Sequence, residues 1–327
     1  MSPGRLPEED VLLIAGDTLQ VSQTKTYRDI FPLSGEGWRK IRLSFHHVVG
    51  AGGTVPNPLG AYRFIKGINL RTSRNENPIS VPGMGLYYLN YLMNGVEPGY
   101  TTVVAGALTF HCNIDIPFTF PFISKKEDLS ILSSRYTMIE LELQTGTLAD
   151  LQRTPAAATQ AVTVDISLVR NKSGFKDTGQ PIGMPYIKHL APFQAVAKGY
   201  ADIESADDLI LFGFFAVAND LVTWGTVGNP FDGTPVDLMT DISFEDNLMS
   251  WVKTKKVDSF QEDRAHYSNS RTLAGVYPYL FAKEGSYKSG YPTGGRSEIK
   301  FKIGNGAYVA ATTPQVDIVL FGTRELR

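Results

Sequence analysis

The sequence predicts an all-β protein: two tandem eight-stranded jelly-roll β-barrels with a few short helices in loops. Short segments with alternating apolar and polar residues recur along the chain, as at residues 139–143 (Ile-Glu-Leu-Glu-Leu). A period of two places one side of a strand in the core and the other outside. The 31 glycines and 19 prolines suit many strands joined by turns. The strand pattern also occurs twice in the same order, which predicts a duplicated domain.

The closing strands of the two halves show the duplication best. Residues 139–143 and 162–168 alternate, and the pair returns at 299–303 and 316–320, at offsets of 160 and then 152 residues. The earlier matches pair 27–30 with 200–203, 38–48 with 209–218, 67–70 with 241–244, and 113–118 with 276–281. The offset starts at 173 to 174 and then falls, as expected if the second copy has shorter loops.

Domain boundaries follow from where the pattern starts, stops and restarts. We expect an N-terminal arm at 1–36, a first barrel at 37–170, a linker at 171–199 and a second barrel at 200–327. Eight strands of about six residues, with short loops, fit each half. The arm contains an apolar run at 11–15 that packs either on its own domain or on another surface. Glycines and prolines interrupt the linker.

Two short helices are expected in the first half. Residues 82–95 are rich in Leu, Tyr and Met and end in Asn94-Gly95, a glycine stop. Ser124 and Glu127 form a capping box that would start a helix running to about residue 133. A parallel α/β fold would need long amphipathic helices between strands, and the pattern supports only these two short ones.

Composition excludes several functional classes. The formal net charge is −2, without the basic excess of a nucleic-acid binder. Cys112 is the only cysteine, so an internal disulfide and a cysteine zinc cluster are excluded, and a reducing compartment is expected. We expect no signal peptide, and the longest uncharged window, 78–96, contains too many Gly, Pro and Asn residues for a transmembrane helix. These features predict a soluble protein.

Glu140 and Glu142 form the most conspicuous pair of acids. They lie on one side of a predicted strand, about 7 Å apart by strand rise, a spacing that could suit a glycosidase pair. The preferred interpretation is a solvated strand face, because the residues between them are apolar. Lys300 and Lys302 occupy the matching positions in the second half, which favours surface over catalysis.

The sequence matches no other motif of catalysis or binding, and we predict no catalytic, cofactor-binding or metal-binding residues and no cofactor. The five histidines are His46, His47, His111, His189 and His266. They do not form the pattern of a cupin metal site, and neighbours in a strand such as His46 and His47 point to opposite faces. The glycine loops 50–53 and 294–295 lack the residues of a phosphate-binding motif. Asp232, Gly233, Asp237 and Asp241 suggest either turn chemistry or a cation at an interface.

Tyrosines gather in the second half, at positions 267, 277, 279, 287 and 291. Tyrosine is enriched in large protein contact surfaces, which is the preferred interpretation. A sugar-binding platform is the alternative, so the second functional hypothesis is a carbohydrate-binding or carbohydrate-active β-sandwich protein.

The predicted architecture resembles a known family. Residues 68–74 (Ile-Asn-Leu-Arg-Thr-Ser-Arg), 81–83 and 114–118 read like the first barrel of the double jelly-roll major capsid proteins of membrane-containing icosahedral phages. These are the tectivirus, corticovirus and finnlakevirus types, related to the adenovirus hexon. The resemblance extends over roughly residues 30–325 and rests on architecture, including the helix expected at Ser124 and the lack of a catalytic signature.

This resemblance implies a structural coat protein and not an enzyme. Three chains would form a pseudo-hexameric homotrimer that tiles an icosahedral shell over an internal membrane. The implied partners are other copies of the chain, neighbouring capsomers, and vertex or penton proteins, with the N-terminal arm near the membrane. Direct nucleic-acid binding is not expected. The implied location is the virion capsid, assembled in the host cytoplasm.

Overall fold

The structure is a computed structural model of the chain. It describes residues 8–32, 37–49, 59–73, 77–95, 97–98, 109–123, 131–132, 135–151, 160–171, 183–194, 198–203, 206–221, 230–237, 239–246, 250–255, 273–296, 299–305 and 314–325.

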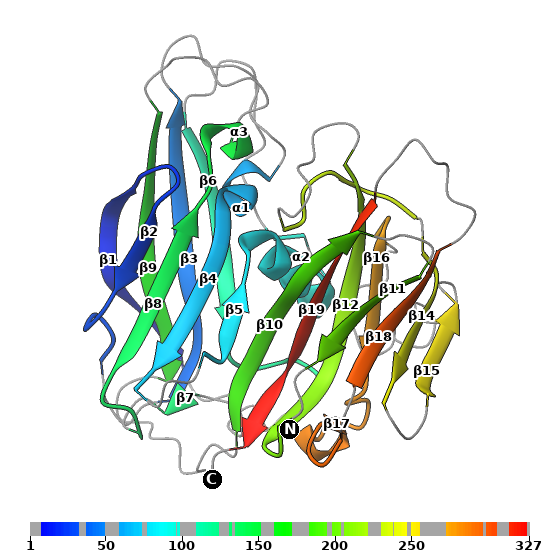
Figure 1. Ribbon diagram of the computed structural model, residues 1–327. Coiled ribbons are helices and arrows are strands. Elements are labelled where there is room, and N and C mark those ends of the chain that lie inside the picture. The colour runs from blue at the N-terminus through cyan, green and yellow to red at the C-terminus, as the bar shows by residue number, and fades with distance from the viewer. Residues whose placement is uncertain are drawn as a thin grey trace. The chain divides into compact units, whose positions relative to one another are not determined.

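The chain divides into two compact units (Figure 1). The first unit, the first barrel, consists of Met1–Tyr91, Glu97–Phe120 and Lys125–Pro185. The second unit, the second barrel, consists of Leu92–Val96, Pro121–Ser124 and Tyr186–Arg327.

The first barrel contains two antiparallel sheets. One sheet has the spatial order β1 (Glu8–Leu19), β9 (Gln160–Asn171), β3 (Gly37–Val49) and β6 (Thr109–Pro117), and β7 (Ile131–Leu132) pairs with the start of β3. The other has the order β5 (Ile79–Val81), β4 (Ile65–Thr72), β8 (Ile139–Thr145) and β2 (Thr24–Tyr27).

The second barrel repeats this arrangement. One sheet has the order β10 (Gly183–Gln194), β19 (Pro314–Glu325), β12 (Leu209–Asp220) and β16 (Val276–Leu280), and the short β13 (Thr234–Pro235) and β17 (Tyr291–Pro292) also pair with β12. The other has the order β11 (Lys198–Ile203), β18 (Ile299–Asn305), β14 (Met239–Glu245) and β15 (Ser250–Lys255).

The order of strands identifies the fold. When the eight main strands of each barrel are counted along the chain, one sheet always joins the first, eighth, third and sixth, and the other joins the second, seventh, fourth and fifth. Two antiparallel sheets that exchange strands in this way form a jelly roll. The prediction of two tandem eight-stranded jelly rolls is therefore confirmed.

Strand register tests the individual repeat matches. Leu70 lies opposite Leu141 in the first barrel, and Phe244 lies opposite Phe301 in the second, so the match of 67–70 with 241–244 is correct. Tyr27 also pairs with Leu141, whereas Phe301 pairs with Ala201. The residue equivalent to Tyr27 is therefore Ala201, and the predicted match of Tyr27 with Tyr200 is wrong by one residue. A one-residue slip matters because it exchanges the two faces of a strand.

The core of each barrel is formed by alternate residues of the paired strands. In the first barrel Ile41 and Leu43 of β3 are fully buried opposite Ile116 and Ile114 of β6. Phe214 of β12 is the centre of an aromatic cluster in the second barrel. Its ring centroid lies 4.4 Å from that of Phe301, and the rings of Phe244, Tyr279 and Phe281 lie within 6.4 Å of it.

Two predicted domain boundaries need correction. The region 1–36, expected to be an arm, supplies β1 and β2, and β1 pairs with β9 from Glu8 to Leu19. The region 171–199, expected to be a linker, contains β10 and the start of β11. The alternation is hidden in β1 by register shifts on either side of Ile14, and Pro185 and Pro192 obscure it in β10.

The helices are short. Within the described residues they are α1 (Gly60–Phe64), α2 (Gly83–Asn94), α3 (Leu148–Leu151) and the 3₁₀ turn η3 (Tyr287–Ser289). The helix expected at 82–95 is confirmed as α2, which is followed by Gly95 at φ 67°. The start of the helix expected at Ser124 falls at 124–130, outside the described residues, and residues 131–132 form β7. Among the described helices, none has the length and apolar character needed to cross a bilayer.

Truncation of Phe214 to alanine is expected to destabilise the second barrel by about 3–5 kcal/mol, because the lost ring leaves a cavity among aromatic neighbours. Urea denaturation measures the loss, and hydrogen exchange of amides in β12, β14 and β18 localises it. Val48→Ala is the control, since the Val48 side chain is 45% exposed and its truncation should change stability by less than about 0.5 kcal/mol. Equal effects of the two substitutions would contradict this assignment of the core.

Candidate functional site on the outer face of the first barrel

The outer face of the β1-β9-β3-β6 sheet is the candidate site. Along β3 the core residues alternate with partly exposed residues from Lys40 to Val48. On the neighbouring β6, His111 and Asn113 are exposed and Asp115 is half-buried. Polar and charged side chains from several strands therefore share one accessible surface, here called the outer face.

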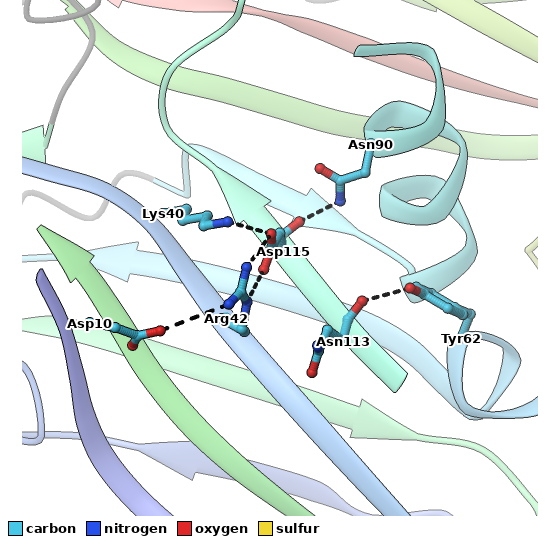
Figure 2. Close-up of polar contacts among 7 residues, drawn as sticks. All are labelled: Asp10, Lys40, Arg42, Tyr62, Asn90, Asn113 and Asp115. Atoms are coloured by element: carbon cyan, nitrogen blue, oxygen red, sulfur yellow. Dashed lines mark hydrogen bonds and ion pairs between the residues drawn. The ribbon is translucent and has the colours of Figure 1, made fainter. Parts of the chain in front are cut away.

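Asp115 is the centre of an ion-pair group on this face (Figure 2). The Arg42 Nε donates to Asp115 Oδ1 at 2.8 Å and Nη2 donates to Oδ2 at 3.2 Å, a bidentate contact. Lys40 Nζ donates to Asp115 Oδ2 at 2.6 Å. Asp10 Oδ2, on β1, lies 3.8 Å from Arg42 Nη1. The group thus connects β1, β3 and β6, and its two cations balance its two carboxylates.

This environment shifts the pKa of Asp115. Burial alone would raise the pKa of the carboxyl, but the hydrogen bonds from Arg42 and Lys40 outweigh burial and hold it below its ordinary value. The pKa of Arg42 is raised, first by its hydrogen bond to Asp115. The pair is therefore ionised over the physiological pH range.

Side chains from two helices cover the outer edge of β6. The Tyr62 hydroxyl of α1 donates to the Asn113 carbonyl oxygen at 2.6 Å, and Asn90 Nδ2 of α2 donates to the Asp115 carbonyl oxygen at 2.7 Å (Figure 2). Burial raises the pKa of the Tyr62 hydroxyl, which keeps it a donor. Unpaired carbonyl groups on a sheet edge attract foreign strands, and these two bonds occupy two of the carbonyl groups on the β6 edge.

A second polar group lies further along the same strands. His46 and His111 are directly opposite one another on β3 and β6, with their Nδ1 atoms 2.5 Å apart. His46 Nε2 lies 3.0 Å from Asp165 Oδ2 on β9. The sequence indicated only isolated strand histidines, because His46 and His111 are 65 positions apart in the chain and only the register of β3 with β6 makes them neighbours.

The equivalent face of the second barrel is closed. Phe215 and Val217 of β12 and Val319 and Phe321 of β19 are buried, although they alternate with the core residues of the same strands. Phe122 contributes to this cover, with its ring centroid 6.2 Å from that of Phe321. Of the two corresponding faces, the one on the first barrel is the more accessible.

A buried polar network lies on this closed face. Asp317 is fully buried, and its Oδ1 lies 2.9 Å from His189 Nε2. Asn219 Nδ2 and Gln315 Nε2 each donate to Asp317 Oδ2 at 3.2 Å. Hydrogen bonds of this kind compensate a buried carboxylate for the loss of water.

Glu140 and Glu142 are not on a solvated face, and that expectation is wrong. Their side chains are only 5% and 9% exposed. Arg28 Nε donates to Glu140 Oε2 at 2.6 Å, and Asn69 Nδ2 donates to Glu142 Oε1 at 2.9 Å. Arg71 Nη2 lies 3.4 Å from Glu142 Oε2. Period two indicates on which side of a strand a residue lies, but it does not indicate whether that side is covered.

The expected tyrosine surface is also largely internal. Tyr277 and Tyr291 are buried, and Tyr279 packs against Phe214 in the aromatic core. Tyr291 donates to Asp246 Oδ2 at 2.6 Å. Tyr267 lies outside the described residues, and Tyr287 forms part of η3.

The remaining predicted residues are dispersed. Asp237 Oδ1 accepts a hydrogen bond from the Gly275 amide at 2.7 Å, Asp232 is buried before the turn at Gly233, and Asp241 lies in β14.

His47 and Cys112 are buried, and burial raises the pKa of the Cys112 thiol. Gly294 and Gly295 form a turn, whereas residues 50–53 and His266 fall outside the described part of the chain. Within that part, no group of three or more His, Cys, Asp or Glu residues is arranged to hold a metal ion.

Comparison with known proteins supports the fold. Neither a family model nor a curated protein sequence matches the chain. The major capsid protein of STIV, the Sulfolobus turreted icosahedral virus, matches with a TM-score of 0.73 at 13% identity, over 98% of this chain and 97% of that chain. The major capsid protein P2 of bacteriophage PM2 matches at 0.63 and 10% identity, over 98% of each chain.

A third capsid protein also matches. The major capsid protein of Faustovirus matches at 0.57 and 7% identity, over 100% of this chain and 92% of that chain. The chain therefore has, over its full length, the double jelly-roll fold of these three capsid proteins.

Replacement of Asp115 by asparagine is expected to lower the free energy of unfolding by about 1–3 kcal/mol at pH 7, because Arg42 and Lys40 lose their shared anion. The folded-state pKa of Asp115 is depressed, so its contribution is present above the unfolded value near 3.9 and is lost as pH falls through the folded value. Urea denaturation from pH 7 to pH 2.5 should therefore show the two proteins converging below about pH 4.

Asn113→Ala is the matched control, because Asn113 is an exposed neighbour on the same strand and its backbone carbonyl would still accept from Tyr62. It should follow the unmodified protein at every pH. A difference between D115N and the unmodified protein that widens in acid would show that the ion pair does not have the proposed role.

Proposed function

We propose that this chain is the major capsid protein of an icosahedral virus. The observation that carries the proposal is the full-length match of both barrels to capsid proteins, which leaves almost no part of either chain unmatched.

The duplicated fold supports a specific assembly. Three copies around a three-fold axis contribute six similar barrels, and the resulting capsomer is nearly hexagonal. Six-sided units tile the flat faces of a shell, so two barrels in one chain suit this geometry, and closure requires a different unit at the five-fold vertices. The self-association is thus proposed to be a homotrimer that packs against neighbouring trimers, with a separate protein at the vertices.

The charge of the chain suits a shell that is separated from its genome. The net charge is −2, and a coat in direct contact with nucleic acid would need an excess of basic residues. We therefore propose a lipid membrane beneath the shell, with the N-terminus on the membrane side. Assembly is proposed to occur in the host cytoplasm, and the mature location is the virion.

A carbohydrate-binding role lacks a specific observation in its favour. That hypothesis depended on a tyrosine platform in the second half, and Tyr277 and Tyr291 are core residues. The glutamate pair that suggested hydrolysis is buried and engaged by arginine and amide groups.

The purified chain is expected to form a particle of three times 35.9 kDa, because the proposed capsomer is a trimer. Multi-angle light scattering over a hundredfold range of concentration measures the mass, and negative-stain electron microscopy should show particles with a three-fold axis and a six-sided outline. A monomer that persists at the highest concentration would overturn the proposed assembly.

A further inference from the structure

The His46–His111 pair has the geometry of an unassigned binding site. The two residues are directly opposite across β3 and β6, and their rings meet edge to face with centroids 4.6 Å apart. His111 is exposed, and the side chain of His46 is 33% exposed, so an ion from solvent can reach both.

Asp165 sets the tautomer of His46. The Nε2 atom of His46 lies 3.0 Å from Asp165 Oδ2, close enough for Nε2–H to donate to the carboxylate. The Gly16 amide donates to the other carboxylate oxygen, Oδ1, at 2.6 Å and fixes its orientation. Since Nε2 carries the proton, Nδ1 of neutral His46 is left with a lone pair directed at His111.

The two Nδ1 atoms therefore face a common point. At 2.5 Å they are closer than in an ordinary N–H···N hydrogen bond, and two lone pairs at this distance repel unless a proton or a cation lies between them. Imidazole nitrogen is a preferred ligand of Zn²⁺, Ni²⁺ and Cu²⁺. A carboxylate on the distal nitrogen is the usual support of a metal-bound histidine, because it orients the ring and raises its basicity.

We propose that the outer face of the first barrel binds one divalent transition-metal ion through Nδ1 of His46 and Nδ1 of His111, with Asp165 orienting His46. Two nitrogens at about 2.05 Å from a tetrahedral ion are about 3.3 Å apart, so the rings must separate by about 0.8 Å. Binding of the ion therefore requires a small displacement of the exposed His111 side chain. Water completes the coordination, which makes this an open site with two protein ligands, and the proposal is independent of the coat function.

Isothermal titration of the full-length protein with ZnCl₂, and separately with CuSO₄, tests the site. One equivalent should bind, and Cu²⁺ should bind more tightly than Zn²⁺, following the usual order of divalent ions. Replacement of either histidine by alanine should weaken binding by at least about tenfold, and Asp165→Asn should weaken it by about ten- to a hundredfold through the loss of the supporting carboxylate. Asn113→Ala, on the same face, should bind normally.

A second measurement separates this site from incidental binding elsewhere. In the Zn²⁺-loaded protein, the side-chain ¹⁵N resonances of two histidines should shift in the way that shows metal on Nδ1. In His46→Ala, addition of Zn²⁺ should produce neither of these two shifts. Circular dichroism of each variant establishes that the barrel is folded. The proposal would be overturned if metal binding survived when His46 and His111 were both replaced by alanine. It would also be overturned if the unmodified protein took up no metal.

Discussion

Each barrel depends on its last strand, which is hydrogen-bonded on both sides. In the first barrel β9 lies between β1 and β3, and in the second β19 lies between β10 and β12. The pairing of Glu8 with Asn171 joins residues at opposite ends of the first barrel. Until this strand is in place, β1 lacks its partner and the sheet is incomplete. Contacts so distant in sequence are costly in loop entropy, so the central position of the last strand makes closure of each barrel a late and cooperative event.

Closure determines which surfaces are left for function. The last strand places alternate residues in the core and leaves the intervening ones on the opposite face of the sheet. In the second barrel this opposite face is buried, with apolar residues such as Val319 and Phe321 beside the Asp317 network, whereas in the first barrel it remains partly exposed, as at Asp165 and Ser167. The duplicated sheets thus have the same topology and different surfaces, and the polar groups around Asp115 and His46 occur where the first barrel is open.

The sequence predicted the fold well wherever alternation was clean. Strands such as β3, β8 and β18 have period two, and the order of these segments revealed the duplication. Prediction failed where period two was interrupted, as in the bulged β1, and where burial depended on distant segments, as for Glu140. The histidine pair was missed for the same reason: His46 and His111 become neighbours only through the register of β3 and β6. A single sequence shows which residues can alternate, but register is determined by the packing of whole sheets.

The seventh strands of the two barrels illustrate how duplicated barrels remain distinct. In the first barrel Glu140 lies opposite Arg71 of β4, whereas in the second Lys300 lies opposite Glu245 of β14. The sign of the charge is reversed at equivalent positions, although each pair is complementary.

This reversal has a consequence for folding. If β8 paired by mistake with β14, Glu140 would face Glu245, and if β18 paired with β4, Lys300 would face Arg71. Like charges directly opposite in a sheet are destabilising. Two barrels with the same strand order in one chain risk exchanging strands during folding, and opposite charge patterns on matching strands oppose that exchange while preserving the core that both barrels share.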